Sequence, residues 1–285
     1  MADLHGTDPY GQPTAELALS DIHAALPASP EELRDALPGL EPERHVTDWG
    51  RSERVERLLD QTVVGFLYHY WFRVEVEGIE NVPDRGGALL VSNHGGAIPP
   101  DGAMIGKALG EAHQRPRPLH LAVEPTFANF PGVGMLQTKL GVVGTHPANL
   151  HRLLFDEQQL VLTFPEGRKA TRKTLSERYR MARFQSTAFI EAAMRARVPI
   201  VPVAVLGAEE SVPVFARLPR LRITTGLPLP AKFRIRFLEP VSADSFGGAP
   251  WEDDGLVQAL SHDIRALIQE NLLELVAQRR SVWLG

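Results

Sequence analysis

Residues 89–102 read Leu89-Leu90-Val91-Ser92-Asn93-His94-Gly95-Gly96-Ala97-Ile98-Pro99-Pro100-Asp101-Gly102. The stretch begins as a short apolar run and turns abruptly into a polar loop rich in Gly and Pro. A short apolar run bounded by turn residues is typical of a strand that is buried on both faces. A helical pattern follows from about Asp101 to Leu109. In open α/β sheets, ligands bind where such strands end, so this loop is the first candidate site.

The same signals recur along the chain. Apolar runs predict buried strands at 159–164 and 199–205, with shorter strands at 119–123 and 141–144 and an edge strand at 73–78. Helical spacing predicts helices at 148–156, 179–197 and 254–280, and a broken helix at 129–140. Because strands alternate with helices, the fold class is α/β, with a mostly parallel central sheet flanked by helices.

An amphipathic helix is predicted from Arg51 to Trp71, with charge in its first half and aromatic residues crowded in its second. Two interpretations stay open for its apolar face. It packs against its own domain, as most amphipathic helices do, or its aromatic end lies in a bilayer interface.

The chain divides into four segments. Residues 1–50 are predicted to form a partly helical arm, with a helix start at Ser29 and Glu32. Residues 51–77 hold the amphipathic helix and the edge strand, and residues 78–250 form the core. Residues 251–285 form a C-terminal helix that packs on the core. No signal peptide or membrane-spanning segment is visible in the sequence, so we expect a soluble protein or one that lies on a membrane surface.

Composition narrows the chemistry. The chain has no cysteine, which removes disulfides, thiolate metal sites and cysteine nucleophiles. The net charge of −5 argues against a nucleic-acid partner, for which a basic domain is expected.

His94 and Asp101 are the first candidate catalytic pair. A neutral imidazole can accept a proton from a hydroxyl at neutral pH, and a carboxylate on its other ring nitrogen fixes the tautomer. Taken alone, the pair is equally compatible with Asp101 as a helix cap and His94 as a turn residue.

Phe164-Pro165-Glu166-Gly167 ends the second buried strand, and the basic run Arg168-Lys169-Ala170-Thr171-Arg172-Lys173 follows it. The carboxylate between Pro and Gly is positioned to bind a substrate hydroxyl, and the basic run could take phosphates. The alternative is a β-turn followed by a solvated basic face.

Together, these blocks are more specific. The chain resembles the glycerolipid acyltransferase family of lysophosphatidate and glycerol-3-phosphate acyltransferases in three blocks. They are an Asn-His at a strand end with an Asp downstream, a Phe-Pro-Glu-Gly about 70 residues later, and Val198-Pro199-Ile200-Val201-Pro202-Val203. The resemblance covers roughly residues 78–240, and the order and spacing of the three blocks match.

The resemblance implies direct acyl transfer from acyl-CoA or acyl carrier protein, as co-substrate, to a lipid hydroxyl, with no acyl-enzyme, cofactor or metal. His94 would be the general base and Asp101 would orient it. Glu166 and Gly167 would help bind the glycerol portion of the acceptor, Arg168 with Lys169 would face a phosphate, and Pro199 to Pro202 would help shape the acyl or acceptor site. The full set of substrate-binding residues would be Asn93, Pro165, Glu166, Gly167, Arg168, Lys169, Pro199 and Pro202. The protein would be cytoplasmic and peripheral at the inner face of the membrane.

Two features depart from the family pattern. Six residues separate His94 from Asp101 where the family usually has four, which resembles a divergent branch. The middle block, 141–147, lacks the usual phosphate-binding Arg, which weakens the case for a phosphorylated acceptor and leaves a neutral glycerolipid open.

Further alternatives remain. The segment 211–238 contains no Asp or Glu and either contacts an anionic bilayer or forms a solvated loop and edge strand. A metal-dependent hydrolase with His94, Asp101 and Glu166 as ligands is disfavoured by the lack of closely spaced His pairs. A lipid-binding protein that lost turnover would fit the lengthened His–Asp spacing.

Overall fold

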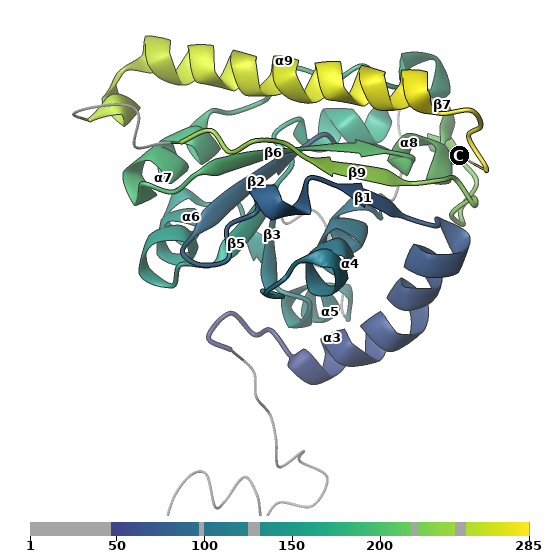
Figure 1. Cartoon of the computed structure of the whole chain (residues 1–285), viewed down its shortest axis with the longest axis horizontal. Coiled ribbons are helices and arrows are strands. Elements are labelled where there is room, and N and C mark those ends of the chain that lie inside the picture. The colour runs from purple at the N-terminus through teal and green to yellow at the C-terminus, as the bar shows by residue number, and fades with distance from the viewer. Residues whose placement is uncertain (1–46, 97–99, 125–131, 218–221, 243–248, 285) are drawn as a thin grey trace, which may run out of the picture. The chain divides into compact units, whose positions relative to one another are not determined.

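The computed structural model describes residues 47–96, 100–124, 132–217, 222–242 and 249–284, all within one compact unit that spans 46–285. Most of the predicted N-terminal arm, including the helix start at Ser29, lies outside these residues. A seven-stranded sheet has the order β1-β9-β6-β2-β5-β3-β4. All its pairings are parallel except β6 with β9, so the predicted fold class is confirmed (Figure 1).

The strands of the main sheet are β1 (Glu75–Glu77), β2 (Ala88–Ser92), β3 (Leu119–Val123), β4 (Val142–Gly144), β5 (Leu160–Thr163), β6 (Ile200–Leu206) and β9 (Arg234–Phe237). A separate hairpin pairs β7 (Val214–Arg217) with β8 (Arg222–Thr224). The helices are α3 (Glu53–Leu59), α4 (Asp101–Ala112), α5 (Val133–Lys139), α6 (Pro147–His151), α7 (Ala188–Ala196), α8 (Ala208–Ser211) and α9 (Asp254–Gln278).

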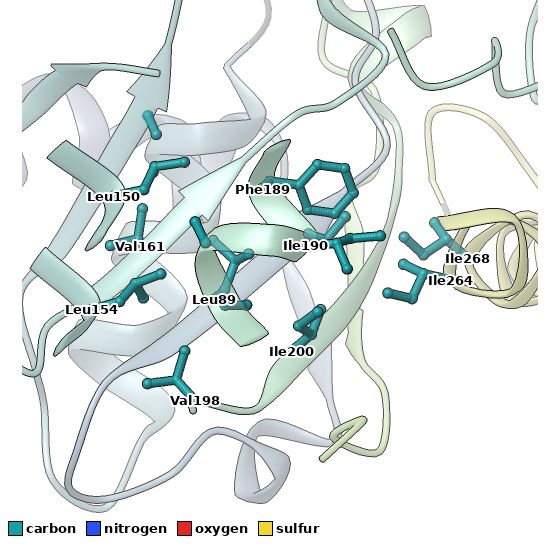
Figure 2. Close-up of a cluster of buried hydrophobic side chains, with 14 of the residues drawn as sticks. Leu89, Leu150, Leu154, Val161, Phe189, Ile190, Val198, Ile200, Ile264 and Ile268 are labelled. Carbon is teal, nitrogen blue, oxygen red and sulfur yellow. The ribbon is translucent and has the colours of Figure 1, made fainter. Parts of the chain in front are cut away.

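Apolar side chains pack on both faces of this sheet. On one face, Leu89 of β2 and Ile200 of β6 pack with Ile190 of α7 and Ile264 of α9 (Figure 2). On the other face, Leu90 lies in a second cluster with α4 and the helical segment that follows α3. Because successive residues of β2 point to opposite faces and all five are buried, the strand reads as a continuous apolar run.

The amphipathic segment begins at Glu53 as α3 and continues through two π-helical turns, Asp60–Val64 and Leu67–Trp71. Tyr68 and Phe72 are buried in the α4 cluster, so the core-facing interpretation holds for one side of the segment. A second apolar side is exposed, and it is formed by Leu58, Val63, Phe66 and Tyr70, which are 62, 55, 51 and 73% exposed. Within the described ranges, no helix is both long and apolar enough to cross a membrane.

The predicted helix 179–197 is wrong in its first half, because α7 begins only at Ala188. The backbone N–H groups before α7 donate to acceptors that are distant in the sequence, whereas in a helix they would donate to carbonyls one turn back. The pairs are Tyr179 to Glu209, Met181 to Gln269, Ala182 to Glu166 and Gln185 to Pro165. The segment is therefore extended and wraps around buried side chains.

In the last third of the acid-free segment 211–238, three basic side chains are paired with carboxylates. Lys232 and Arg234 pair with Glu75, and Arg234 and Arg236 both pair with Glu77 of β1. The acids that balance these cations lie elsewhere in the sequence, so the bilayer interpretation loses these three side chains. Strand β9 is also internal in the sheet, between β6 and β1, where an edge strand was the alternative.

Candidate functional site

Three neighbouring parallel strands bring the candidate residues to one edge of the sheet. Strand β2 lies between β5 and β6, with Val91 opposite Thr163 on one side and Pro202 on the other. His94 follows the carboxyl end of β2, and Glu166 follows that of β5. Because parallel strands end at the same edge, residues 72 positions apart in the sequence meet there.

Asn93 connects the end of β2 to the end of β6. Its amide donates to the carbonyl oxygen of Val205 and accepts from the N–H of the same residue, both at 2.8 Å. Its side chain is 3% exposed. The side chain of Asn93 therefore forms a bridge to the backbone of Val205, which fixes the peptide that leads into His94, and its contact with a substrate stays a prediction.

His94 and Asp101 form the expected pair. The Nδ1 atom of His94 lies 2.9 Å from Oδ2 of Asp101, whose side chain is 1% exposed while that of His94 is 14% exposed. Asp101 is also held by the N–H groups of Gly95 and Gly102, at 3.4 and 2.9 Å. The carboxylate thus accepts three hydrogen bonds, which fix its orientation.

The imidazole has one ring nitrogen left for chemistry. Its ring stacks on that of Phe164, with centroids 4.2 Å apart and an interplanar angle of 28°. An Nδ1–H donated to Asp101 leaves the lone pair of Nε2 available as an acceptor, and Nε2 has no hydrogen-bond partner among the described residues. This geometry suits abstraction of a proton from a hydroxyl.

Glu166 is fully buried, with no exposed surface, and its carboxylate is used within the protein. Its Oε1 accepts the backbone N–H of His94 at 3.1 Å, and its Oε2 accepts that of Ala182. Lys173 approaches the same Oε2 at 3.5 Å. Within the protein, Glu166 fixes the main chain of His94, and its direct contact with a substrate stays a prediction. His94, Asp101 and Glu166 do not form a metal-binding group, since Glu166 contacts the backbone of His94, and no such group of three is found among the residues that the structure describes.

Gly167 has φ of +56°, which glycine adopts without strain, and a Cβ there would lie 2.5 Å from Nε2 of Gln185. Pro165 is buried, and its carbonyl accepts the N–H of Gln185. Arg168 and Lys169 are exposed, and neither has a carboxylate partner in the part of the chain that the structure describes.

The structure corrects the expectation for Pro199 and Pro202. Pro199 precedes Ile200, which is in register with Leu89 at the amino end of β2, so it lies at the opposite edge of the sheet from His94. Pro202 is buried inside the sheet, opposite Val91. These two prolines support the strand and do not line the site.

Sequence reasoning missed three residues that complete the site. Phe164 supports the imidazole ring, Lys173 is a buried cation next to Glu166, and Glu209 packs against Gly95. The position of Glu209 just after the buried strand β6 was a usable signal, because functional side chains gather at strand ends. Lys173 carried no such signal, because the basic run that contains it was expected either to bind phosphates or to form a solvated face.

Comparison with known proteins adds independent information. A family model described as Acyltransferase matches residues 73–206, which include β1 to β6 and both members of the His94–Asp101 pair. An uncharacterised protein of Mycobacterium leprae (strain TN) is 34% identical over 290 residues, which cover 95% of this chain and 78% of that protein. An uncharacterised protein of Mycobacterium tuberculosis (strain ATCC 25618 / H37Rv) is 31% identical, with coverage of 95% and 80%.

A solved structure shares the fold. The 1-acyl-sn-glycerophosphate (LPA) acyltransferase PlsC of Thermotoga maritima superposes with a TM-score of 0.56 and 20% sequence identity, and the match covers 80% of each chain. At this identity, the likeness concerns the arrangement of strands and helices.

Proposed function

The chain belongs to the acyltransferase family, and we propose that it moves a fatty acyl group from a thioester donor, acyl-CoA or acyl carrier protein, to a hydroxyl of a glycerolipid-type acceptor. The observation that carries the proposal is the His94–Asp101 pair at 2.9 Å at the carboxyl edge of the sheet, where Nε2 has no hydrogen-bond partner among the residues described.

In the proposed reaction, Nε2 of His94 takes the proton of the acceptor hydroxyl while its oxygen bonds to the thioester carbonyl carbon. Asp101 stabilises the imidazolium that forms. The tetrahedral intermediate then collapses, the carbon–sulfur bond breaks, and the leaving thiolate takes the proton back from Nε2. No group of the protein is acylated in this sequence. Asn93 and Glu166 hold the backbone on either side of the imidazole.

Arg168 and Lys169 would bind a phosphate of the substrates. They are exposed and follow directly on Gly167. The double variant Arg168→Ala/Lys169→Ala should raise KM for a phosphorylated acceptor more than for a neutral one if the phosphate is that of the acceptor. An equal rise in KM for the donor with every acceptor would assign them to the donor.

Attachment at the inner face of the membrane would use the exposed side of the amphipathic segment. Its four apolar side chains are more than half exposed, and two of them are aromatic, which suits the interface of a bilayer. The double variant Phe66→Ser/Tyr70→Ser should lose co-sedimentation with lipid vesicles and keep its turnover of short-chain, water-soluble substrates. Unchanged vesicle binding would remove this segment from the membrane contact.

The direct test is thiol release from a long-chain acyl-CoA, measured with a thiol reagent across glycerol-3-phosphate, lysophospholipids, monoacylglycerol and diacylglycerol. The protein has no cysteine and adds no background. We expect release that requires one class of acceptor and is lost in His94→Ala. The matched control is His69→Ala, because His69 also pairs with a carboxylate, Glu111 at 3.0 Å, on the exposed surface.

Two results would count against the proposal. Thiol release that survives in His94→Ala would remove His94 from the chemistry. No release by the folded protein with any acceptor, from either acyl-CoA or acyl carrier protein, would favour the binding-protein alternative. That alternative would have been supported by a separated His94 and Asp101, whereas the two are in hydrogen-bond contact.

A further inference from the structure

Lys173 is a buried cation placed between two buried carboxylates behind the loop of His94. Its Nζ atom lies 2.6 Å from Oε1 of Glu209 and 3.5 Å from Oε2 of Glu166. The side chains of Lys173, Glu209 and Glu166 are 10, 11 and 0% exposed. Nζ also donates to the carbonyl oxygen of Arg180, at 3.3 Å. A buried ion group of this kind needs a balance of charge and hydrogen bonds to remain ionised.

Both carboxylates contact the main chain that carries the imidazole. Glu166 accepts the N–H of His94. Glu209 packs against Gly95 so closely that a Cβ on Gly95 would lie 2.2 Å from its Cγ. The next residue, Gly96, has φ of +85°, and a Cβ there would lie 2.7 Å from the carbonyl oxygen of Ala208. The loop is thus set against α8 by groups that Lys173 holds in place.

The other partners of the two carboxylates come from the extended segment before α7. Ala182 donates to Glu166, and Tyr179 donates its N–H to the second oxygen of Glu209 at 2.6 Å. This segment is held in turn by α9, where Gln269 bonds to Tyr179 and Met181. The loop, the segment and the two acids therefore form one unit, with Lys173 as the cation between the two acids.

Lys173 is the residue of this cluster whose loss would most disturb its balance of charge. Burial raises the pKa of Glu209 above its usual value, against the opposing effect of Lys173. Burial works to lower the pKa of Lys173, but Glu166 and Glu209 outweigh it and hold that pKa above the usual value. Two further charged groups, Glu210 and Arg279, pair with each other and with the hydroxyl of Tyr179. Loss of Lys173 would leave two neighbouring carboxylates with no counter-charge between them.

We propose that Lys173, acting through Glu166 and Glu209, is a positioning residue for acyl transfer, because it keeps both carboxylates in the arrangement that fixes the main chain of His94 and Gly95. The inference rests on the proposed role of His94 as the general base. It adds a cation outside the His94–Asp101 pair that sets the position of the imidazole without touching a substrate.

The test compares three variants with the wild type. Lys173→Met removes the charge at similar length and should lower kcat between about 10- and 100-fold, with KM for both substrates nearly unchanged, because small displacements of a catalytic group have effects of that size. Lys173→Arg should recover most of the loss. The matched control is Lys107→Met: Lys107 is 9% exposed and also bridges two carboxylates, Asp60 at 2.6 Å and Glu111 at 2.8 Å. That control should lose stability and keep kcat.

The pH profile separates positioning from simple stabilisation. Lys173 opposes the effect of burial on the pKa of Glu209, so without Lys173 that pKa rises further and the acid limb of kcat should move to higher pH in Lys173→Met. In Glu209→Gln this titrating carboxyl group is gone while Lys173 keeps its contact with Glu166, so the limb should not move to higher pH. A shift in Lys173→Met that is missing in Glu209→Gln is not expected from a loss of stability. If Lys173→Met does not fold, Glu209→Gln decides the matter through kcat, which should fall because Glu209 packs against Gly95, and an unchanged kcat would overturn the inference.

Failure of the inference and failure of the proposed function give different results. If the wild type and Lys107→Met turn over and Lys173→Met matches them in kcat and pH profile, Lys173 has no positioning role. If Lys173→Met changes KM for one substrate alone, Lys173 binds that substrate instead. If the wild type itself is inactive, hydrogen exchange of the amides of residues 93–96 still tests the inference: exchange should be faster in Lys173→Met than in Lys107→Met, and equal rates would overturn it.

Discussion

Asp101→Asn is the sharpest perturbation of the proposed dyad, because it removes one charge and preserves the shape of the side chain. The carboxylate is 1% exposed and lies 2.9 Å from Nδ1, so water screens it little. An amide in its place can donate to Nδ1, which would put the proton on Nε2. The nitrogen that faces the substrate would then be a donor where the reaction needs an acceptor.

The magnitude follows from the geometry. With an N–O distance of 2.9 Å, the centres of the imidazolium and carboxylate charges lie roughly 4 Å apart, and at an effective dielectric constant of about 20 their attraction is about 4 kcal/mol. That energy stabilises the imidazolium of the transition state and corresponds to about a 10³-fold fall in kcat. KM should stay near the wild-type value, because the proposed stabilisation acts on the imidazolium that forms as the proton is transferred and not on substrate binding.

The assay is steady-state thiol release with the best donor and acceptor, at the pH where the wild type is fastest. The control is Glu111→Gln, which removes the carboxylate from the imidazole of His69, 3.0 Å away. A fall of less than about 10-fold in Asp101→Asn, with His94→Ala inactive and both variants folded, would refute the electrostatic argument. It would leave Asp101 with a structural role only, as the carboxylate that accepts the N–H groups of Gly95 and Gly102; it is the first residue of α4, whose N-cap is Pro100, so the helix-cap alternative does not hold.

Three further predictions concern the loop, the acid stability and the core. Gly95→Ala should lower kcat about 100-fold with a much smaller effect on the melting temperature, since its Cβ would displace the loop or Glu209; unchanged kcat would mean that the loop position is not critical. Burial, with Arg51 adding to it, lowers the pKa of His120 to about 4. Unfolding therefore takes up a proton between pH 6.5 and 4, so stability should fall by about 3 kcal/mol as the pH drops through that window. His120→Gln should flatten this loss in denaturant titrations, and an equally steep slope would assign it to other groups. Ile190→Ala should lower the free energy of unfolding by about 2–5 kcal/mol, because Ile190 is fully buried between the sheet and α9, and a loss below 1 kcal/mol in urea titrations would show that the site collapses around the smaller side chain.

The sheet could be predicted from the sequence because its signals are local. The strand predicted at 119–123 coincides with β3, and the runs at 159–164 and 199–205 contain β5 and most of β6. Each is a short apolar run bounded by turn or polar residues. Such a run predicts a strand buried on both faces from the local sequence alone, without knowledge of its partners in the fold. The His94–Asp101 pair was accessible for the same reason, since both residues flank one strand-to-helix loop.

The remainder of the site depended on partners far away in the sequence. The segment before α7 has apolar residues at helical spacing, yet its N–H groups bond to side chains as distant as Gln269. Glu166 was expected to face a substrate, but the N–H groups of His94 and Ala182 and the ammonium of Lys173 surround its carboxylate. No rule based on spacing predicts such a cluster, because it exists only once three strand ends and a crossing segment have been brought together.

The lengthened spacing between His94 and Asp101 follows from how each residue is held. His94 is fixed by the end of β2, through Asn93 and Glu166, and Asp101 is fixed by α4, whose buried Met104 and Ile105 pack on the sheet. The distance between the two side chains is therefore set by the packing of a helix on a sheet, and the number of residues in the connecting loop has only to be sufficient to span it. Loop closure adds little free energy for two extra residues. The contact between His94 and Asp101 can thus be kept with six intervening residues, provided that α4 keeps its position on the sheet. Substitutions in the buried face of α4 should therefore disturb this contact more than substitutions in the loop itself.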